Sequence, residues 1–88
     1  MTYTPTPDII ATDLRDELVL LDPATQEMFS LNATGRVVWQ SLPARDVDAI
    51  ARLVAREFAV SESDAAADVI RLLERLVAAG LVQRGEDR

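Results

Sequence analysis

Residues 17–31 read ELVLLDPATQEMFSL, and this stretch decides the fold. The apolar run Glu17–Asp22 is short, which favours a strand that is buried on at least one face. Asp22 and Pro23 then occupy positions that a type I turn prefers, and the chain returns over Gln26–Leu31. The side chains of the returning strand alternate between two faces, with Glu27, Phe29 and Leu31 on one face and Gln26, Met28 and Ser30 on the other.

A further strand can form on the N-terminal side of this stretch, over Ile9–Leu14. A polar turn at Arg15 and Asp16 would join it to Glu17. Three short strands in a row are most simply arranged as an antiparallel meander. Residues 1–8, rich in Thr and Pro, are expected to be a flexible or polyproline-like lead-in. We therefore predict a domain over residues 9–84 and a disordered tail over residues 85–88.

The rest of the chain has the pattern of three helices. Their predicted starts are marked by residues that favour N-caps, and their ends by residues that stop helices: Asn32 before a helix to Leu42 and Pro43, Asp46 before Val47–Phe58, and Ser61 before a helix to Ala79 and Gly80. The segment Leu81–Arg84 would add a short strand or simply trail off. The fold class is then α+β, a winged helix-turn-helix with a three-stranded antiparallel sheet followed by three helices.

Composition excludes most chemistry. The chain has no cysteine and no histidine, and every one of its 9 basic residues is an arginine. Thiol nucleophiles, His-based triads, lysine Schiff bases and Cys/His metal sites are therefore absent. Carboxylate clusters at Asp13, Asp16 and Glu17 and at Asp46 and Asp48 resemble solvated turns and caps. We expect no enzyme, no cofactor and no metal.

The net charge of −6 makes nucleic acid a poor partner. No apolar run approaches the ~20 residues that span a bilayer, so no membrane is expected. The N-terminus lacks the basic start and apolar run of a signal peptide, and disulfides are impossible. These features predict a cytoplasmic protein.

Two features leave alternatives open. The third helix exposes a stripe of charged residues, Asp64, Asp68, Arg71 and Arg75. The stripe either complements the helix dipole, with Arg71 paired to Asp68 or Glu74, or forms one wall of a peptide groove. Gly35, in the first helical turn, is either tolerated near a helix end or required by a close neighbour.

A family resemblance accompanies these patterns. The chain from Ile9 to Gln83 is similar to the PqqD-like family, the leader-peptide recognition domains (RiPP recognition elements) of ribosomally made peptide biosynthesis. Its most specific part is Leu31-Asn32 closing a strand, with Gly35 and Trp39 in the next helix. Within the family, the Asn-Ala-Thr-Gly form resembles the stand-alone recognition proteins of lasso-peptide clusters. Pro43-Ala44-Arg45 follows the first predicted helix, where PqqD itself often carries a glycine. This difference makes the chain less similar to PqqD itself.

The resemblance implies that a precursor leader adds as an antiparallel strand to Gln26–Leu31 and lies against the helix wall Ser61–Arg75. It further implies a pocket near Leu20, Met28 and Leu72 for a tyrosine or proline of the leader. The peptide-binding residues expected from it are Leu20, Glu27, Met28, Phe29, Ser30, Asp64, Asp68, Arg71, Leu72 and Arg75.

The function implied is non-catalytic: an adaptor that binds the leader of a lasso-peptide precursor. The adaptor would deliver it to a separate cysteine leader peptidase, with the cyclase as a further candidate partner. One alternative is a PqqD-type peptide chaperone for a radical SAM enzyme. Another is an acidic winged-helix regulator that binds DNA or a protein.

Overall fold

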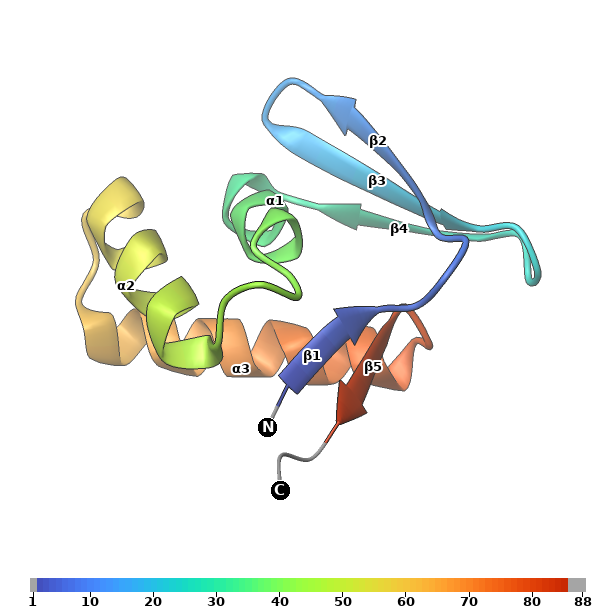
Figure 1. Ribbon diagram of the computed structural model, residues 1–88. Coiled ribbons are helices and arrows are strands. Elements are labelled where there is room, and N and C mark those ends of the chain that lie inside the picture. Colours follow the sequence, from blue (N-terminus) through green and yellow to red (C-terminus); the bar gives the residue numbers. More distant parts are fainter. Residues whose placement is uncertain (1, 86–88) are drawn as a thin grey trace.

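The computed structural model describes residues 2–85 and has mixed α+β architecture, as predicted (Figure 1). The elements follow in the order β1 (Thr2–Pro5), β2 (Ile10–Leu14), β3 (Glu17–Asp22), β4 (Glu27–Leu31), α1 (Ala33–Gln40), α2 (Val47–Phe58), α3 (Glu62–Ala78) and β5 (Val82–Gly85). Strands β2, β3 and β4 form the predicted three-stranded antiparallel sheet, and three helices follow it.

The meander has β3 at its centre. Leu20 pairs with Phe29 of β4, and Leu21 pairs with Met28, so the two members of each pair share a face of the sheet. Strand β4 begins at Glu27, one residue later than predicted. Gln26 belongs to the turn because its φ of 62° is left-handed and cannot continue a strand.

The N-terminal segment differs from the flexible lead-in that was predicted for it. Thr2–Pro5 is strand β1, which pairs antiparallel with β5 in a separate two-stranded sheet (Figure 1). Tyr3 and Val82 are buried in the core, and this burial holds β1 and β5 against the rest of the domain. Gly85 therefore belongs to β5, whereas the rest of the predicted tail, residues 86–88, lies outside the described residues.

The helix caps follow the sequence closely. Asn32, Asp46 and Ser61 each accept a hydrogen bond from the backbone N–H three residues on. Helix α3 ends in a Schellman motif, in which Gly80 has a φ of 78° and Leu81 N–H donates to the Leu76 carbonyl at 2.9 Å.

Helix α1 ends at Gln40, earlier than the predicted Leu42. The Ser41 hydroxyl donates to the Val37 carbonyl at 2.7 Å, and Leu42 precedes a proline, where the helical conformation is disfavoured.

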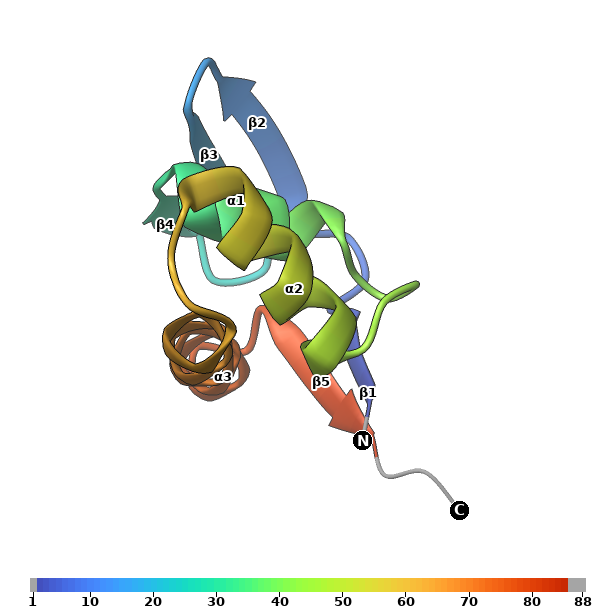
Figure 2. The same ribbon diagram turned by 90° about the vertical axis from the view of Figure 1, so that its left-hand side faces the viewer.

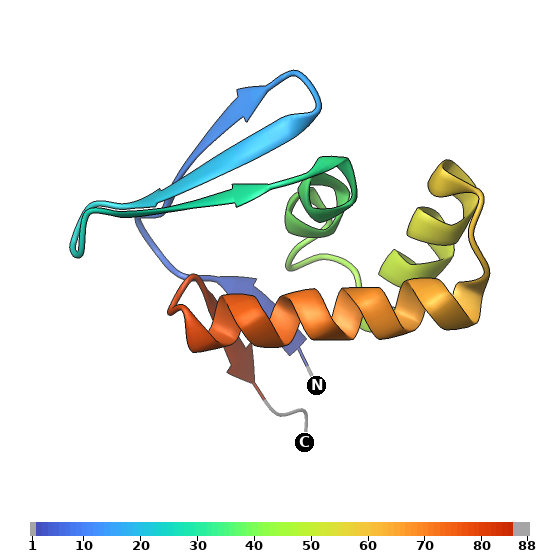
Figure 3. The same ribbon diagram turned by 180° about the vertical axis from the view of Figure 1, so that it is seen from behind.

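The core lies where the helices meet the inner face of the meander. Helix α1 contacts β3, β4, α2 and α3, so it occupies the space between the sheet and the other two helices (Figures 1 and 3). Viewed along α3, the meander and the β1–β5 pair diverge on different sides of the helices (Figure 2). The large fully buried side chains are Leu20, Val38, Ile50, Val54, Val69, Leu73 and Leu76. Within residues 2–85, no helix has the length and apolar character needed to cross a membrane.

Candidate functional site

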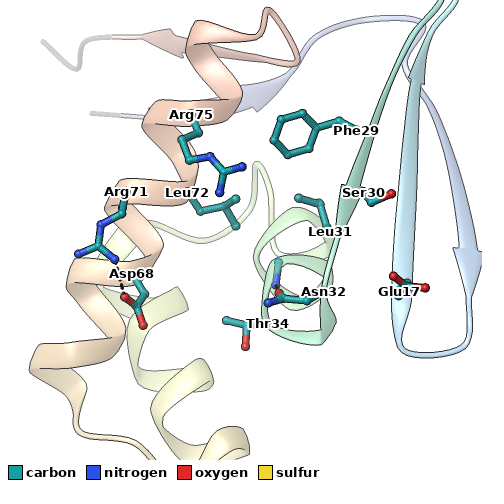
Figure 4. Close-up of a pocket in the computed structure, with 11 residues that line it drawn as sticks. Glu17, Phe29, Ser30, Leu31, Asn32, Thr34, Asp68, Arg71, Leu72 and Arg75 are labelled. Atoms are coloured by element: carbon teal, nitrogen blue, oxygen red, sulfur yellow. Dashed lines mark hydrogen bonds and ion pairs between the residues drawn. The ribbon is translucent and has the colours of Figure 1, made fainter.

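The outer edge of β4 carries no partner strand among the described residues, and it faces α3 across a cavity of about 500 Å³. Figure 4 shows this cavity between the strand and the helix. Its lining comes from β3, β4, the beginning of α1 and the middle of α3: Glu17; Phe29, Ser30 and Leu31; Asn32, Thr34 and Gly35; Asp68, Arg71, Leu72 and Arg75.

The β4 side of the cavity is held in place by packing against the core. Leu31 is buried, and Phe29 is half-buried against the core. A Cβ at Gly35 would lie 3.0 Å from the Leu31 Cβ, tighter than nine in ten real Cβ contacts, so Leu31 would have to shift by a few tenths of an ångström. The structure therefore favours the second reading of Gly35, in which a close neighbour disfavours a side chain. Asn32 Oδ1, which accepts from Gly35 N–H at 2.9 Å, holds the junction between β4 and α1.

The helix wall presents side chains from successive turns of α3. Asp68 accepts a hydrogen bond from Arg71 at 3.0 Å, as one reading of the stripe expected. The Arg75 guanidinium carbon lies 5.4 Å from the centre of the Phe29 ring, within cation–π range. Figure 4 shows Arg75 and Phe29 approaching each other from opposite walls, above Leu72. The Arg75–Phe29 contact therefore bridges the groove.

The cavity carries both signs of charge. Glu17 and Asp68 contribute carboxylates, and Arg71 and Arg75 contribute guanidinium groups. The Asp68 and Arg71 side chains are 60% and 70% exposed, so their mutual pairing is weak and open to competition by a ligand. An extended chain lying along β4 could therefore hydrogen-bond to the strand edge while its side chains meet apolar surface and both charges.

The structure brings together most of the predicted site residues. The 500 Å³ cavity is lined by Phe29, Ser30, Asp68, Arg71, Leu72 and Arg75. Glu27 and Met28 instead line a second cavity of about 240 Å³ at the beginning of β4. Asp64 is exposed on α3 but lines neither cavity, so its role stays a prediction.

The structure corrects the prediction that Leu20 contacts the peptide. It is 0% exposed and belongs to the core, so no ligand reaches it in this structure. Leu20 pairs with Phe29 and shares its inner face, whereas Met28 pairs with Leu21 and points to the outer face. A single pocket near Leu20, Met28 and Leu72 is therefore wrong.

Sequence reasoning missed several lining residues: Glu17, Leu31, Asn32, Thr34 and Gly35. The sequence pattern of Glu17 is that of a solvated turn, and it gives no sign that this residue reaches the groove. Asn32, Thr34 and Gly35 lie at the start of α1, where the Asn-Ala-Thr-Gly motif was a family signal whose contact with the groove could have been inferred.

A separate ion pair joins helix α1 to strand β2. Arg36 of α1 donates two hydrogen bonds to the Asp13 carboxylate of β2, at 2.9 and 2.7 Å. The hydrogen bond from Arg36 lowers the pKa of Asp13, against the smaller opposing effect of desolvation. Asp13 therefore belongs to this structural contact and lines neither cavity.

Solved structures share this fold. One, described as TbiB1 in complex with the TbiA(beta) leader peptide, is 24% identical with a TM-score of 0.85, and the match covers 96% of this chain and 99% of that one. Another, described as lasso peptide synthetase B1 complexed with the leader peptide, is 25% identical with a TM-score of 0.86, covering 96% and 100%.

No curated protein matches the chain. A family model does: the one described as coenzyme PQQ synthesis protein D (PqqD) matches residues 17–82. That range is most of the sequence, and it includes strands β3 and β4, the three helices and every residue that lines the groove between β4 and α3. The resemblance found in the sequence is confirmed, and the chain belongs to the PqqD family.

Proposed function

We propose that this chain is a leader-peptide recognition protein of lasso-peptide biosynthesis. The observation that carries the proposal is the unpaired edge of β4 facing α3 across the 500 Å³ cavity. A strand edge offers free N–H and C=O groups to any extended chain, and the facing helix supplies the side chains that choose among such chains.

The binding mode follows from the geometry of β4. An antiparallel leader strand would place alternate side chains on the inner face, opposite Phe29 and Leu31, and the intervening ones on the outer face, opposite Met28 and Ser30. Backbone hydrogen bonds would provide affinity that depends little on sequence. Specificity would come from the inner side chains, which meet Leu72, the Asp68–Arg71 pair and Arg75.

The solved relatives support this assignment. Both are described as complexes with leader peptides, and one of them as lasso peptide synthetase B1. They match almost the full length of this chain. The leader of a lasso-peptide precursor is therefore the ligand that we assign to the groove.

The adaptor would act without catalysis of its own. With neither cysteine nor histidine, the chain lacks the thiol nucleophile and the histidine base of a cysteine peptidase. Leader removal would fall to a separate cysteine leader peptidase, which receives the precursor bound to this protein, and the cyclase is a further candidate partner. Site residues proposed for the leader are those of the β4–α3 groove.

The family model favours one second candidate. Its description, coenzyme PQQ synthesis protein D, is consistent with the same groove serving as a peptide chaperone for a radical SAM enzyme. The two candidates differ in the peptide that is bound, so the identity of the ligand decides between them.

The test is a titration of the purified protein against a fluorescent leader peptide from a precursor gene beside its own. Scrambled leader and a quinone-cofactor precursor peptide serve as controls. Saturable binding at micromolar concentration or tighter, specific to the lasso leader, is the expected result. Binding of the quinone-cofactor precursor alone would favour the chaperone, and binding of neither would overturn the proposal.

A further inference from the structure

The second cavity lies beyond the Phe29 ring, between the beginning of β4 and the C-terminal end of α3. Phe29 lines both cavities, so this one continues the groove rather than forming a separate hollow. Besides Phe29, its lining consists of Asp22, Glu27, Met28, Ala78, Ala79 and Leu81.

The two cavities differ in charge. The first is lined by two carboxylates and two guanidinium groups, whereas the second is lined by the carboxylates of Asp22 and Glu27 and by no basic residue of the described chain. Ala78 and Ala79 end α3, whose C-terminus adds a partial negative charge at the same place. The second cavity is thus suited to a cation.

The remaining walls are apolar. Phe29 and Leu81 contribute apolar surface beside the carboxylates. Arginine and lysine carry a cationic head on an apolar stem, and such side chains bury the stem against apolar surface while the head stays with polar groups. A small inorganic cation would match the carboxylates but not these walls.

The register of β4 places a peptide side chain at this cavity. On an antiparallel strand added to β4, the inward side chains stand opposite Leu31, Phe29 and Glu27 in turn. Because the added strand runs opposite to β4, the residue facing Glu27 is four positions C-terminal to the residue facing Leu31. Leu31 lines the first cavity and Glu27 lines the second.

We propose that the second cavity is a subsite for an arginine or lysine of the bound peptide, four residues C-terminal to the side chain that enters the first cavity. This inference rests on the proposed function. If it is correct, the leader is also recognised by charge. A basic residue is then preferred at the one leader position that lies beside the C-terminus of α3.

The probe is the leader peptide encoded beside the protein's gene, synthesised with each position replaced in turn by lysine and by glutamate. Titration of the full chain should reveal one position at which lysine binds about tenfold or more tighter than glutamate. Glu27→Gln should reduce that ratio, and Asp22→Asn combined with Glu27→Gln should bring it close to one. Asparagine at position 22 keeps an oxygen that can accept the Ala24 N–H, which Asp22 accepts at 3.0 Å.

The matched control is Asp48→Asn combined with Glu57→Gln on α2, which removes the same charge away from both cavities. It should leave the lysine preference unchanged. A leader that binds with no lysine-preferring position, or with a preference that survives the Asp22/Glu27 double variant, overturns the subsite while the proposed function stands. Failure of every leader variant to bind overturns the proposed function and the subsite with it.

Discussion

The two outer strands of the meander, β2 and β4, have the same length and differ in what lies beside their free edges. All residues of β2 are exposed and none of them lines either cavity, whereas β4 faces α3 across a charged and apolar groove. A free edge alone offers hydrogen bonds to any strand. The contrast supports β4 rather than β2 as the proposed recognition site, because only β4 has a helix wall that could select among extended chains.

Strand β2 also carries a feature that opposes pairing. Asp13 is paired with Leu18, so it points to the inner face of the edge strand, where Arg36 holds it. Inward charges on edge strands discourage edge-to-edge association. The inner face of β4 also carries a charge, Glu27, but only at the first residue of the strand, whereas Phe29 and Leu31 beside the groove are apolar.

The largest expected effect comes from proline at the two edges. Met28→Pro should weaken leader binding about 100-fold or more, because proline removes a backbone donor and distorts β4. Thr12→Pro, on the same outward face of the other outer strand, β2, should leave affinity within about threefold. Fluorescence titration measures both, with circular dichroism to check folding. Equal losses in the two folded variants would remove the distinction between the edges.

Charge reversal on the α3 wall should have the next largest effect. Arg75→Glu removes the contact with the Phe29 ring and makes the groove acidic, and it should cost about 1–3 kcal/mol of leader binding. The same reversal at Arg52, an exposed residue of α2, is the control and should change little. Isothermal titration calorimetry reports the difference. If both variants bind alike, α3 does not contribute to recognition.

A smaller effect is expected at the base of β4. Gly35→Ala places a Cβ against Leu31 and should lower the free energy of unfolding by about 1–2 kcal/mol, although alanine favours helices over glycine. Urea denaturation measures it, with Ala33→Gly, at the first position of α1, as a comparison for helix propensity alone. A stabilised Gly35→Ala variant would show that Leu31 moves aside freely.

The smallest effect concerns β2. Asp13→Asn should reduce stability slightly at neutral pH, because the Asp13–Arg36 pair is partly exposed. The pKa of Asp13 is lowered in the folded chain, so its contribution is present above the ordinary aspartate pKa and is lost as pH falls through the lowered value. Denaturation curves of the two proteins should therefore converge in acid. A difference that persists or grows in acid would contradict this account.

Local signals in the sequence predicted the local structure well. The caps at Asn32, Asp46 and Ser61 and the left-handed Gly80 each depend on a few neighbouring residues, and all of them are confirmed. The pairing of β1 with β5 joins the two ends of the chain, and no local pattern encodes it. The prediction of a flexible N-terminal segment was wrong for that reason.

The candidate site could be predicted only through the family resemblance, which implied a groove between Gln26–Leu31 and Ser61–Arg75, because the spacing of charges on the last helix also fitted a simple complement to the helix dipole. The structure has a cavity between these two segments. The run around Leu20 is apolar at consecutive positions, so its pattern does not show which leucine is covered by the helices. Three-dimensional packing was needed to bury Leu20 and to bring Glu17 to the groove.

Amide hydrogen exchange of the labelled protein, with and without the leader peptide, tests the central claim most directly. The account predicts that leader binding slows exchange at the amides of β4 that face the groove and leaves the amides of β2 unchanged. Protection of β2, or leader binding that protects neither edge, would contradict strand addition at β4.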